Sequence, residues 1–375
     1  MSTPTAQLLR RRLAAIAAGA AAAALLATAS PAAAQGRAPA SSPGAARAVS
    51  GGTWGTAIEV PGTAALNTVG LAYTSAMSCA SAGNCSAGGH YTDGAAFSSV
   101  FVASQVNGRW GTAKEVPGIA ALNTGGFADI YSASCASAGN CSAGGFYIDS
   151  SGHNQAFVVS QVNGRWGTAK EVPGTAALNT GGNAQIDSVS CAKAGDCSAG
   201  GFYTDSSSHG QGFVVSQVNG RWGTAKEVPG GGISSVSCAS AGNCSAGGGL
   251  DVVSQVNGKW GTAEQVPGLA ALNTGLAGID PIECDFTCDP VAGLLSCASA
   301  GNCSAGGYYT DSTRAPHAFV VSQVNGRWGT AKEVAANLRG PLIYSLSCAP
   351  AGNCSAGGGY TDSSGHSQAF VVSQT

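Results

Sequence analysis

Short runs of alternating apolar and polar residues recur along the chain, separated by glycine, proline and asparagine. One stretch holds four such runs, at 187–191, 197–203, 213–218 and 222–228. Runs of this length between turn residues predict β-strands. Asn219-Gly220 stands between the third and fourth runs, and both central residues of a type I′ turn need positive φ, so it predicts a tight hairpin. The stretch therefore predicts a four-stranded antiparallel meander.

This meander is a repeat, marked by two motifs that each occur six times. The motif W-G-T-A begins at Trp54, Trp110, Trp166, Trp222, Trp260 and Trp328. The motif C-A-x-A-G-x-C-S-A-G-G begins at Cys79, Cys135, Cys191, Cys238, Cys297 and Cys348. Six copies of each marker predict six structural units of about 50 residues.

Six such units predict an all-β fold, a six-bladed β-propeller over residues 51–375. The sequence starts with a lone fourth strand, Trp54–Val60, and ends with a lone third strand, Phe370–Thr375. We expect these two strands to pair in the last blade and close the ring. A linear stack of meanders is the alternative, but it would leave exposed sheet edges that a ring removes.

The cysteines fit one crosslink for each unit. Two cysteines on either side of a five-residue turn face each other across a hairpin, so their side chains can join. We expect six disulfides, Cys79–Cys85, Cys135–Cys141, Cys191–Cys197, Cys238–Cys244, Cys297–Cys303 and Cys348–Cys354. Cys284 and Cys288 remain, and we expect them to pair within an insert of the fifth unit.

The first 50 residues predict export. Residues 1–34 combine a basic segment, Arg10–Arg12, an apolar run and the small residues Ala32–Ala34, as in a signal peptide. Residues 35–50 read as a flexible Ala/Pro/Ser leader. We therefore expect a secreted protein, extracellular or associated with the cell envelope, in an environment that favours disulfides. No other apolar run is long enough to span a membrane after the signal is removed.

Composition removes several functional classes. Only 10% of the residues are charged, and the formal net charge is −2. Nucleic acid is not an expected partner, because no basic surface is available for it. The apolar fraction of 44% is too high for a disordered chain. Many of the 57 glycines fall in the repeated Ala-Gly-Gly, Asn-Gly and Pro-Gly motifs.

The run E-V-P-G-T-A-A-L-N-T-G-G-N-A-Q-I-D-S-V-S-C, from Glu171 to Cys191, continues to the second cysteine and Gly201. It resembles repeats of secreted actinobacterial proteins, mostly of unknown function, and the likeness extends over residues 54–375. The resemblance implies a secreted propeller. It carries no assigned catalytic residues.

Antiparallel alternation should place the cysteine turns and Asn-Gly turns on one face, and the longer loops on the other. On the second face a polar set recurs that suits hydrogen bonding and stacking on sugars. Its best copies are Tyr147, Asp149, His153 and Gln155; Tyr203, Asp205, His209 and Gln211; and Tyr360, Asp362, His366 and Gln368. Weaker copies hold Asp93 with Tyr91, and Asp311 and His317 with Tyr309. The alternative is structural, since Asp opens turns by bonding its own backbone.

Other repeated residues also have both a functional and a structural interpretation. The six tryptophans are candidate ligand platforms, although packing against a neighbouring blade is the favoured interpretation. The repeated glutamates beside lysines, such as Glu171 and Lys170, are expected on a solvated face.

A unique acidic insert occurs in the fifth unit. Its carboxylates, Asp280, Glu283, Asp285 and Asp289, form a candidate Ca²⁺ site, because Ca²⁺ takes several oxygen ligands. A solvated insert is the alternative, and no other cofactor is expected.

Enzyme motifs such as Gly-x-Ser-x-Gly and His-Glu-x-x-His are missing from the sequence. Nearly all polar groups come in repeated sets, whereas catalysis needs unique groups. We therefore expect a monomeric, non-enzymatic propeller that binds an extracellular glycan or protein through its loop face. One alternative is a polysaccharide-active enzyme, a hydrolase or lyase, with a central-channel site. Another is a passive cell-envelope scaffold.

Overall fold

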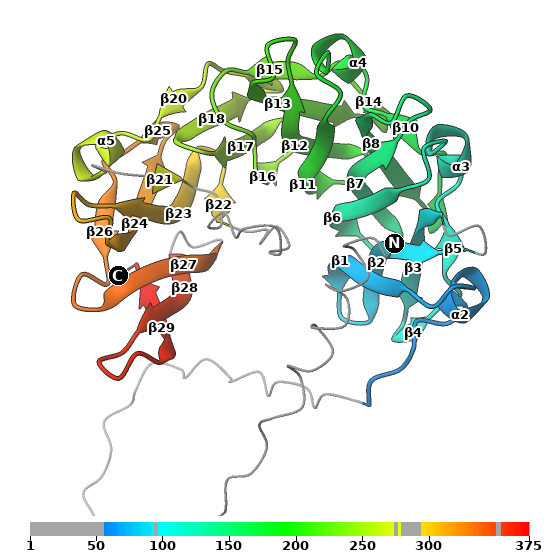
Figure 1. Ribbon diagram of the computed structural model, residues 1–375, viewed down its shortest axis with the longest axis horizontal. Helices are drawn as coiled ribbons and strands as arrows, with labels where there is room; N and C mark the ends of the chain where they lie inside the picture. The colour runs from blue at the N-terminus through cyan, green and yellow to red at the C-terminus, as the bar shows by residue number, and fades with distance from the viewer. Residues whose placement is uncertain (1–55, 94–96, 274–276, 279–293, 350–353, 375) are drawn as a thin grey trace, which may run out of the picture. The chain divides into compact units, whose positions relative to one another are not determined.

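The computed structural model describes residues 56–93, 97–273, 277–278, 294–349 and 354–374. Their strands form six antiparallel sheets that follow one another along the chain (Figure 1). Each sheet is one sequence unit, so the sheets are the six predicted blades of a β-propeller. In blades 1–4 and 6 the first three strands pair in chain order, as a meander, and in blades 1–4 both of the short strands that follow pair with the third strand.

The blades share one pattern of element bounds. Blade 1 comprises β1 (Ala72–Ser81), β2 (Asn84–Thr92), β3 (Ser98–Val106), β4 (Arg109–Trp110) and β5 (Lys114–Glu115). Blade 2 comprises β6 (Ala128–Ser137), β7 (Asn140–Ile148), β8 (Asn154–Val162), β9 (Arg165–Trp166) and β10 (Lys170–Glu171). Blade 3 comprises β11 (Ala184–Lys193), β12 (Asp196–Thr204), β13 (Gly210–Val218), β14 (Arg221–Trp222) and β15 (Lys226–Val228).

The later blades depart more from the pattern. Blade 4 comprises β16 (Ser235–Ser240), β17 (Asn243–Gly248), β18 (Asp251–Val256), β19 (Lys259–Trp260) and β20 (Glu264–Gln265). Blade 5 comprises β21 (Ala277–Gly278), β22 (Leu295–Ser299), β23 (Asn302–Thr310), β24 (Pro316–Val324), β25 (Arg327–Trp328) and β26 (Lys332–Val334). Blade 6 comprises β27 (Arg339–Cys348), β28 (Cys354–Thr361) and β29 (Ser367–Ser373). Within the described residues, four connectors contain a helical turn: α2 (Thr63–Leu66), α3 (Ile119–Leu122), α4 (Thr175–Leu178) and α5 (Leu269–Leu272).

The predicted fourth strand is split into two short pieces in each of blades 1–5. In blade 2 the Gly167 N–H still donates to the Ser160 carbonyl within the blade. The Ala169 N–H instead donates to the Pro117 carbonyl of the preceding connector, at 2.7 Å. The centre of the W-G-T-A motif thus bonds to the neighbouring unit, which a single-unit reading of the sequence misses.

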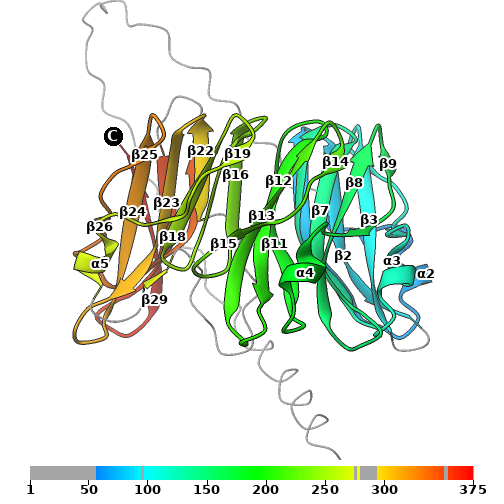
Figure 2. The same cartoon turned by 90° about the horizontal axis from the view of Figure 1, so that it is seen from above.

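Two faces separate as predicted. The Gly108 N–H donates to the Gly83 carbonyl at 2.8 Å, which joins the Asn-Gly turn to the cysteine turn, and the next blades repeat this bond. We call this side the Cys-turn face. The opposite side, which we call the loop face, carries the β2–β3, β7–β8 and equivalent loops together with the connectors. In Figure 2 the two faces lie at the two opposite ends of the strands. All six predicted C-x5-C disulfides are present.

Neighbouring blades pack through their apolar faces. Ile130 of blade 2 contacts Gly88 of blade 1, where a Cβ would come within 3.0 Å of the isoleucine Cδ1. The first strands also bond directly, since the Cys135 N–H donates to Ser78 Oγ at 3.0 Å. The same serine–cysteine bond recurs at the next four interfaces. Each blade therefore buries a face that it could not bury alone.

Several predictions concern residues outside the described ranges. These are the signal peptide 1–34, the leader 35–50, the Cys284–Cys288 pair, and Trp54 of the ring-closing strand. Blade 6 has three strands, and among the described residues no pairing joins residues 57–60 to β29. Ring closure therefore stays a prediction. Within the described ranges, no helix has the length and apolar character to cross a membrane.

Candidate functional site on the loop face

Each repeated aspartate fixes the backbone of its own loop. In blade 2, Asp149 Oδ1 accepts the N–H groups of Ser151 at 2.8 Å and His153 at 3.0 Å. Its Oδ2 accepts Gln155 Nε2 at 2.9 Å. The same bonds recur around Asp205 in blade 3 and Asp362 in blade 6. Oδ1 of these aspartates therefore bonds the backbone of its own loop, as the structural alternative expects, whereas Oδ2 bonds a glutamine side chain.

The glutamine and tyrosine of the set are also tied into the fold. Gln155 Oε1 accepts Asn179 Nδ2 of the following connector at 3.0 Å. Tyr147 donates its hydroxyl to Glu171 Oε2 at 3.2 Å. Sequence reasoning placed the repeated glutamates on a solvated face and missed this bond. The signal was available, because Tyr and Glu recur together in the same repeats.

The histidines of the set are its exposed members. The imidazoles of His209 and His366 are 72% and 74% exposed. Their Nδ1 atoms lie 3.8 Å from Asp205 Oδ2 and 3.6 Å from Asp362 Oδ2. His153 lies beside the next connector, where a Cβ on Gly182 would come within 2.6 Å of its ring. A ligand approaching blades 3 and 6 would therefore meet an imidazole before it met a carboxylate.

The loop hydrogen bonds keep the aspartates ionised. The backbone N–H of His209 lowers the pKa of Asp205, and the backbone N–H of His366 does the same for Asp362. The pKa of the neighbouring tyrosine is shifted upward, because burial and then Glu227 raise the pKa of Tyr203. These groups hold fixed protonation states near neutral pH, which suits hydrogen bonding more than proton transfer.

Blade 5 carries a different cluster. His317 occupies the position of Gln155, not that of His153, and Ala315 takes the histidine position. Its Nδ1 lies 2.8 Å from Glu333 Oε1, its Nε2 lies 3.3 Å from Asp311 Oδ2, and its ring stacks on Tyr309. Burial opposes the charged imidazole, but the bonds to Glu333 and Asp311 raise the pKa of His317.

The remaining predicted copies are incomplete. In blade 1, Asp93 Oδ1 accepts the Phe97 N–H at 3.1 Å, so an aromatic ring replaces the histidine. Blade 4 has a tight turn at Gly249–Leu250 in place of the loop. The proposed Ca²⁺ ligands Asp280, Glu283, Asp285 and Asp289 lie outside the described residues. Within the described ranges, no group of three His, Cys, Asp or Glu side chains is arranged to hold a metal.

The tryptophans pack between blades. Trp222 Nε1 donates to Ser160 Oγ of the preceding blade at 3.2 Å, and Trp260 Nε1 donates to Ser216 Oγ at 2.9 Å. Trp166 and Trp328 pack in the hydrophobic clusters at their own interfaces. The structural interpretation of these four tryptophans is confirmed.

A buried polar pair between blades 1 and 2 was missed by the sequence reasoning. His90 Nδ1 lies 3.1 Å from Asp129 Oδ2, and the imidazole is 1% exposed. Asp129 Oδ1 accepts the Ile130 N–H and lies within reach of the Ser75 hydroxyl. The available signal was His90 itself, which replaces Phe146 and Phe202 of the next two repeats.

Comparison with known proteins gives likenesses at low sequence identity. No protein-family model and no curated protein sequence matches the chain. A subtype N11 neuraminidase-like protein of A/flat-faced bat/Peru shares 13% identity, with 81% of this chain and 87% of that chain covered and a TM-score of 0.39. YCF48 from Cyanidioschyzon merolae shares 13% identity, with 80% and 85% covered and a TM-score of 0.39. The Hadza microbial sialidase Hz136 shares 9% identity, with 79% and 64% covered and a TM-score of 0.38.

Proposed function

We propose that this protein is a secreted, non-enzymatic β-propeller that binds an extracellular partner, a glycan or protein, through its loop face. The observation that carries the proposal is the recurrence of one rigid loop on blades 2, 3 and 6. In each copy the aspartate holds the backbone, and in blades 3 and 6 the imidazole is exposed. Repeated weak sites on one rigid face gain avidity against a repetitive partner.

The protonation states favour binding over catalysis. A glycosidase general acid needs a carboxyl group with a raised pKa. The loop aspartates have the opposite shift, since their pKa values are lowered by loop hydrogen bonds. A raised pKa does occur at Asp251, through burial, but it lies in blade 4, where the loop is replaced by a tight turn.

The first test is a binding screen on glycan arrays, cell-wall material and secreted proteins. The test variant carries His153→Ala, His209→Ala and His366→Ala, which leaves the loop-forming aspartates in place. The matched control carries Arg165→Ala, Arg221→Ala and Arg327→Ala, three exposed cations on the Cys-turn face. We expect the histidine variant to lose affinity by about 10²-fold or more, because avidity multiplies the loss at each site.

Three results would contradict this proposal. One is an unchanged affinity in the histidine variant together with a loss in the arginine control, which would place the partner on the other face. A second is cleavage of a polysaccharide by the purified protein, with or without Ca²⁺, which would favour the enzymatic alternative. The third is a complete lack of partners in the screen, which would favour the passive scaffold.

A further inference from the structure

A cavity of about 580 Å³ lies between blades 1 and 2. Val102, Ser104 and Lys114 of blade 1 line one side of it, and Trp166 of blade 2 lines the other. Arg165, at the Asn-Gly turn of blade 2, also lines the cavity and is exposed. The cavity therefore reaches from the interblade packing to solvent on the Cys-turn face. Its volume is in the range of small-molecule sites in proteins.

The lining of this cavity combines apolar side chains with two cations. Val102, Val106 and Trp166 supply apolar surface, and Lys114 and Arg165 supply positive charge. No aspartate or glutamate is among the described residues that line the cavity. A cavity of this composition suits a molecule that carries both an apolar body and a negative charge.

The two cations are not used to hold the fold together. Among the described residues, no hydrogen bond or ion pair holds the Lys114 ammonium or the Arg165 guanidinium. The equivalent lysine of blade 3, Lys226, instead donates to the carbonyls of Trp260 and Gly261 at 2.7 and 2.8 Å. The lysine of this repeat position therefore closes the interface between blades 3 and 4, whereas Lys114 keeps its charge available to a ligand.

The indole that lines the cavity is also unpaired. Trp166 Nε1 is buried and has no hydrogen-bond partner in the part of the chain that the structure describes. At the next interface, Trp222 Nε1 donates to Ser160 Oγ at 3.2 Å. Ser104 is the blade 1 equivalent of Ser160, so the indole and the serine are joined at the next interface but not at the one that holds the cavity.

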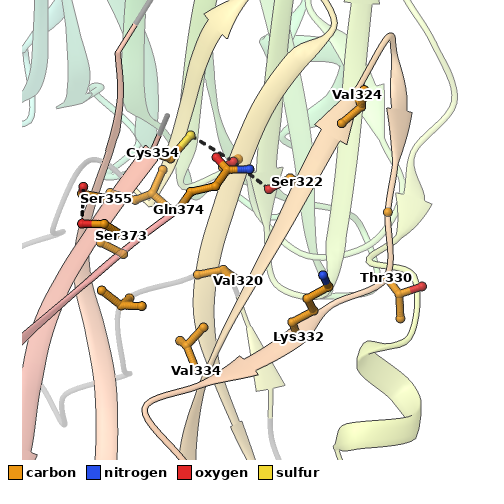
Figure 3. A pocket seen from close by; sticks show the side chains of 15 residues that line it. Val320, Ser322, Val324, Thr330, Lys332, Val334, Cys354, Ser355, Ser373 and Gln374 are labelled. Carbon is orange, nitrogen blue, oxygen red and sulfur yellow. Dashed lines mark hydrogen bonds between the residues drawn. The ribbon is translucent and has the colours of Figure 1, made fainter. Parts of the chain in front are cut away.

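A second cavity occupies the same repeat position between blades 5 and 6 (Figure 3). Its lining includes Val320, Ser322 and Lys332, which are equivalent to the blade 1 residues above. It has a volume of about 380 Å³, and Lys332 is the one cation among the described residues that line it. The cavity between blades 1 and 2 is larger, has a second cation and includes an indole ring, so it is the better ligand site.

We propose that the cavity between blades 1 and 2 binds a small organic carboxylate with an apolar body. The apolar body packs against Val102 and the Trp166 ring, and Lys114 and Arg165 hold the carboxylate. Arginine suits this role because its planar guanidinium can donate two parallel hydrogen bonds to a carboxylate. The site shares no residue with the loop-face histidine set, so it goes beyond the function proposed above.

The proposal is tested by titrating isotope-labelled protein with octanoate and following the tryptophan indole N–H resonances by NMR. The Trp166→Phe variant identifies the Trp166 resonance. We expect this resonance to shift in a saturable way, while that of Trp222, which is bonded to Ser160, stays in place. Octylamine, which has the same alkyl chain but a positive charge, should cause no shift. Naphthoate serves as the aromatic carboxylate.

A pair of double variants tests the two cations. Lys114→Met/Arg165→Gln removes both charges from the cavity and keeps side chains of similar length. We expect it to bind octanoate about tenfold more weakly or worse, because hydrogen bonds between charged groups are the stronger class. The matched control, Lys170→Met/Arg221→Gln, makes the same changes at the next interface and should leave the affinity unchanged.

Three results would overturn the proposal. Equal octanoate binding by the two double variants would show that Lys114 and Arg165 do not hold the carboxylate. An equal shift with octylamine would show apolar adsorption without recognition of charge. Shifts at Val320 and Val372 without one at Trp166 would place the ligand between blades 5 and 6.

A shift of the Trp166 resonance with naphthoate alone would support the site and restrict its ligand to aromatic carboxylates. The NMR readout does not involve the loop face. Failure of this proposal therefore does not bear on binding of a glycan or protein there.

Discussion

At the scale of single residues, the repeated aspartates act through the backbone. Asp149 accepts two backbone N–H groups with one oxygen and a side-chain amide with the other. These are charge-assisted bonds, the stronger class of protein hydrogen bond. The loop is consequently ordered before a partner binds, and this order is what presents the histidines at fixed positions.

Removing this carboxylate should loosen the loop without unfolding the blade. In Asp149→Ala we expect faster hydrogen exchange at the amides of Ser151 and His153, with the β7 and β8 amides unchanged. Asp149→Asn is the control, because its amide oxygen can still accept the same N–H groups. Equal exchange rates in all three proteins would show that the turn forms without the carboxylate.

His317 should make stability depend on pH in blade 5. Its folded-state pKa is raised above the ordinary value by Glu333 and Asp311, against the effect of burial. The charged imidazole therefore stabilises the fold fully below about pH 6.5, which is the pKa of histidine in the unfolded chain. This stabilisation is lost as the pH rises through the higher pKa of the folded state. We expect His317→Gln, which restores the residue of blades 2 and 3, to remove this dependence.

The measurement is the thermal unfolding midpoint of both proteins from acidic to neutral pH. The difference between the two unfolding midpoints should become smaller as the pH rises. Asp311, whose pKa is lowered to about 2 chiefly by the Thr313 hydroxyl, stays ionised throughout this range. A gap that widens with pH would contradict the predicted direction of the His317 shift.

At the scale of elements, the interblade tryptophans divide into two kinds. Trp222 donates a hydrogen bond to the preceding blade, whereas the buried Trp166 Nε1 has no hydrogen-bond partner among the described residues. Trp222→Phe should cost about 1 kcal/mol more than Trp166→Phe in unfolding free energy, because a typical hydrogen bond contributes about that much. Denaturant titration of the two variants measures the difference. A larger loss in Trp166→Phe would assign the stabilisation to packing alone.

Sequence patterns predicted the elements that depend on local chemistry. The Asn-Gly turns need positive φ, and Asn219 and Gly220 have φ of 50° and 80°. The disulfides follow from a five-residue turn in the same way. The split fourth strand was not predictable from one unit, because Ala169 bonds to Pro117 of another unit. The bonds of Tyr147 to Glu171 and of His317 to Glu333 likewise join separate strands of one blade, 24 and 16 residues apart.

At the scale of the whole molecule, repetition explains both the stability and the difficulty of locating function. Every inner blade buries its apolar faces against two neighbours and adds one disulfide. The unique polar groups, such as His317 in blade 5 and the His90–Asp129 pair, occur where one repeat departs from the rest. Val371 of blade 6 and Met77 of blade 1 are 83% and 59% exposed, and the predicted ring closure would bury both.

The most direct test of this account is hydrogen exchange of β29 in the unmodified protein and in Trp54→Ala. If Trp54–Val60 completes blade 6, the β29 amides that face the fourth strand should be protected as strongly as those of β13. They should lose that protection in Trp54→Ala, while β13 is unaffected. Rapid exchange along β29 in the unmodified protein would contradict the closed six-bladed ring.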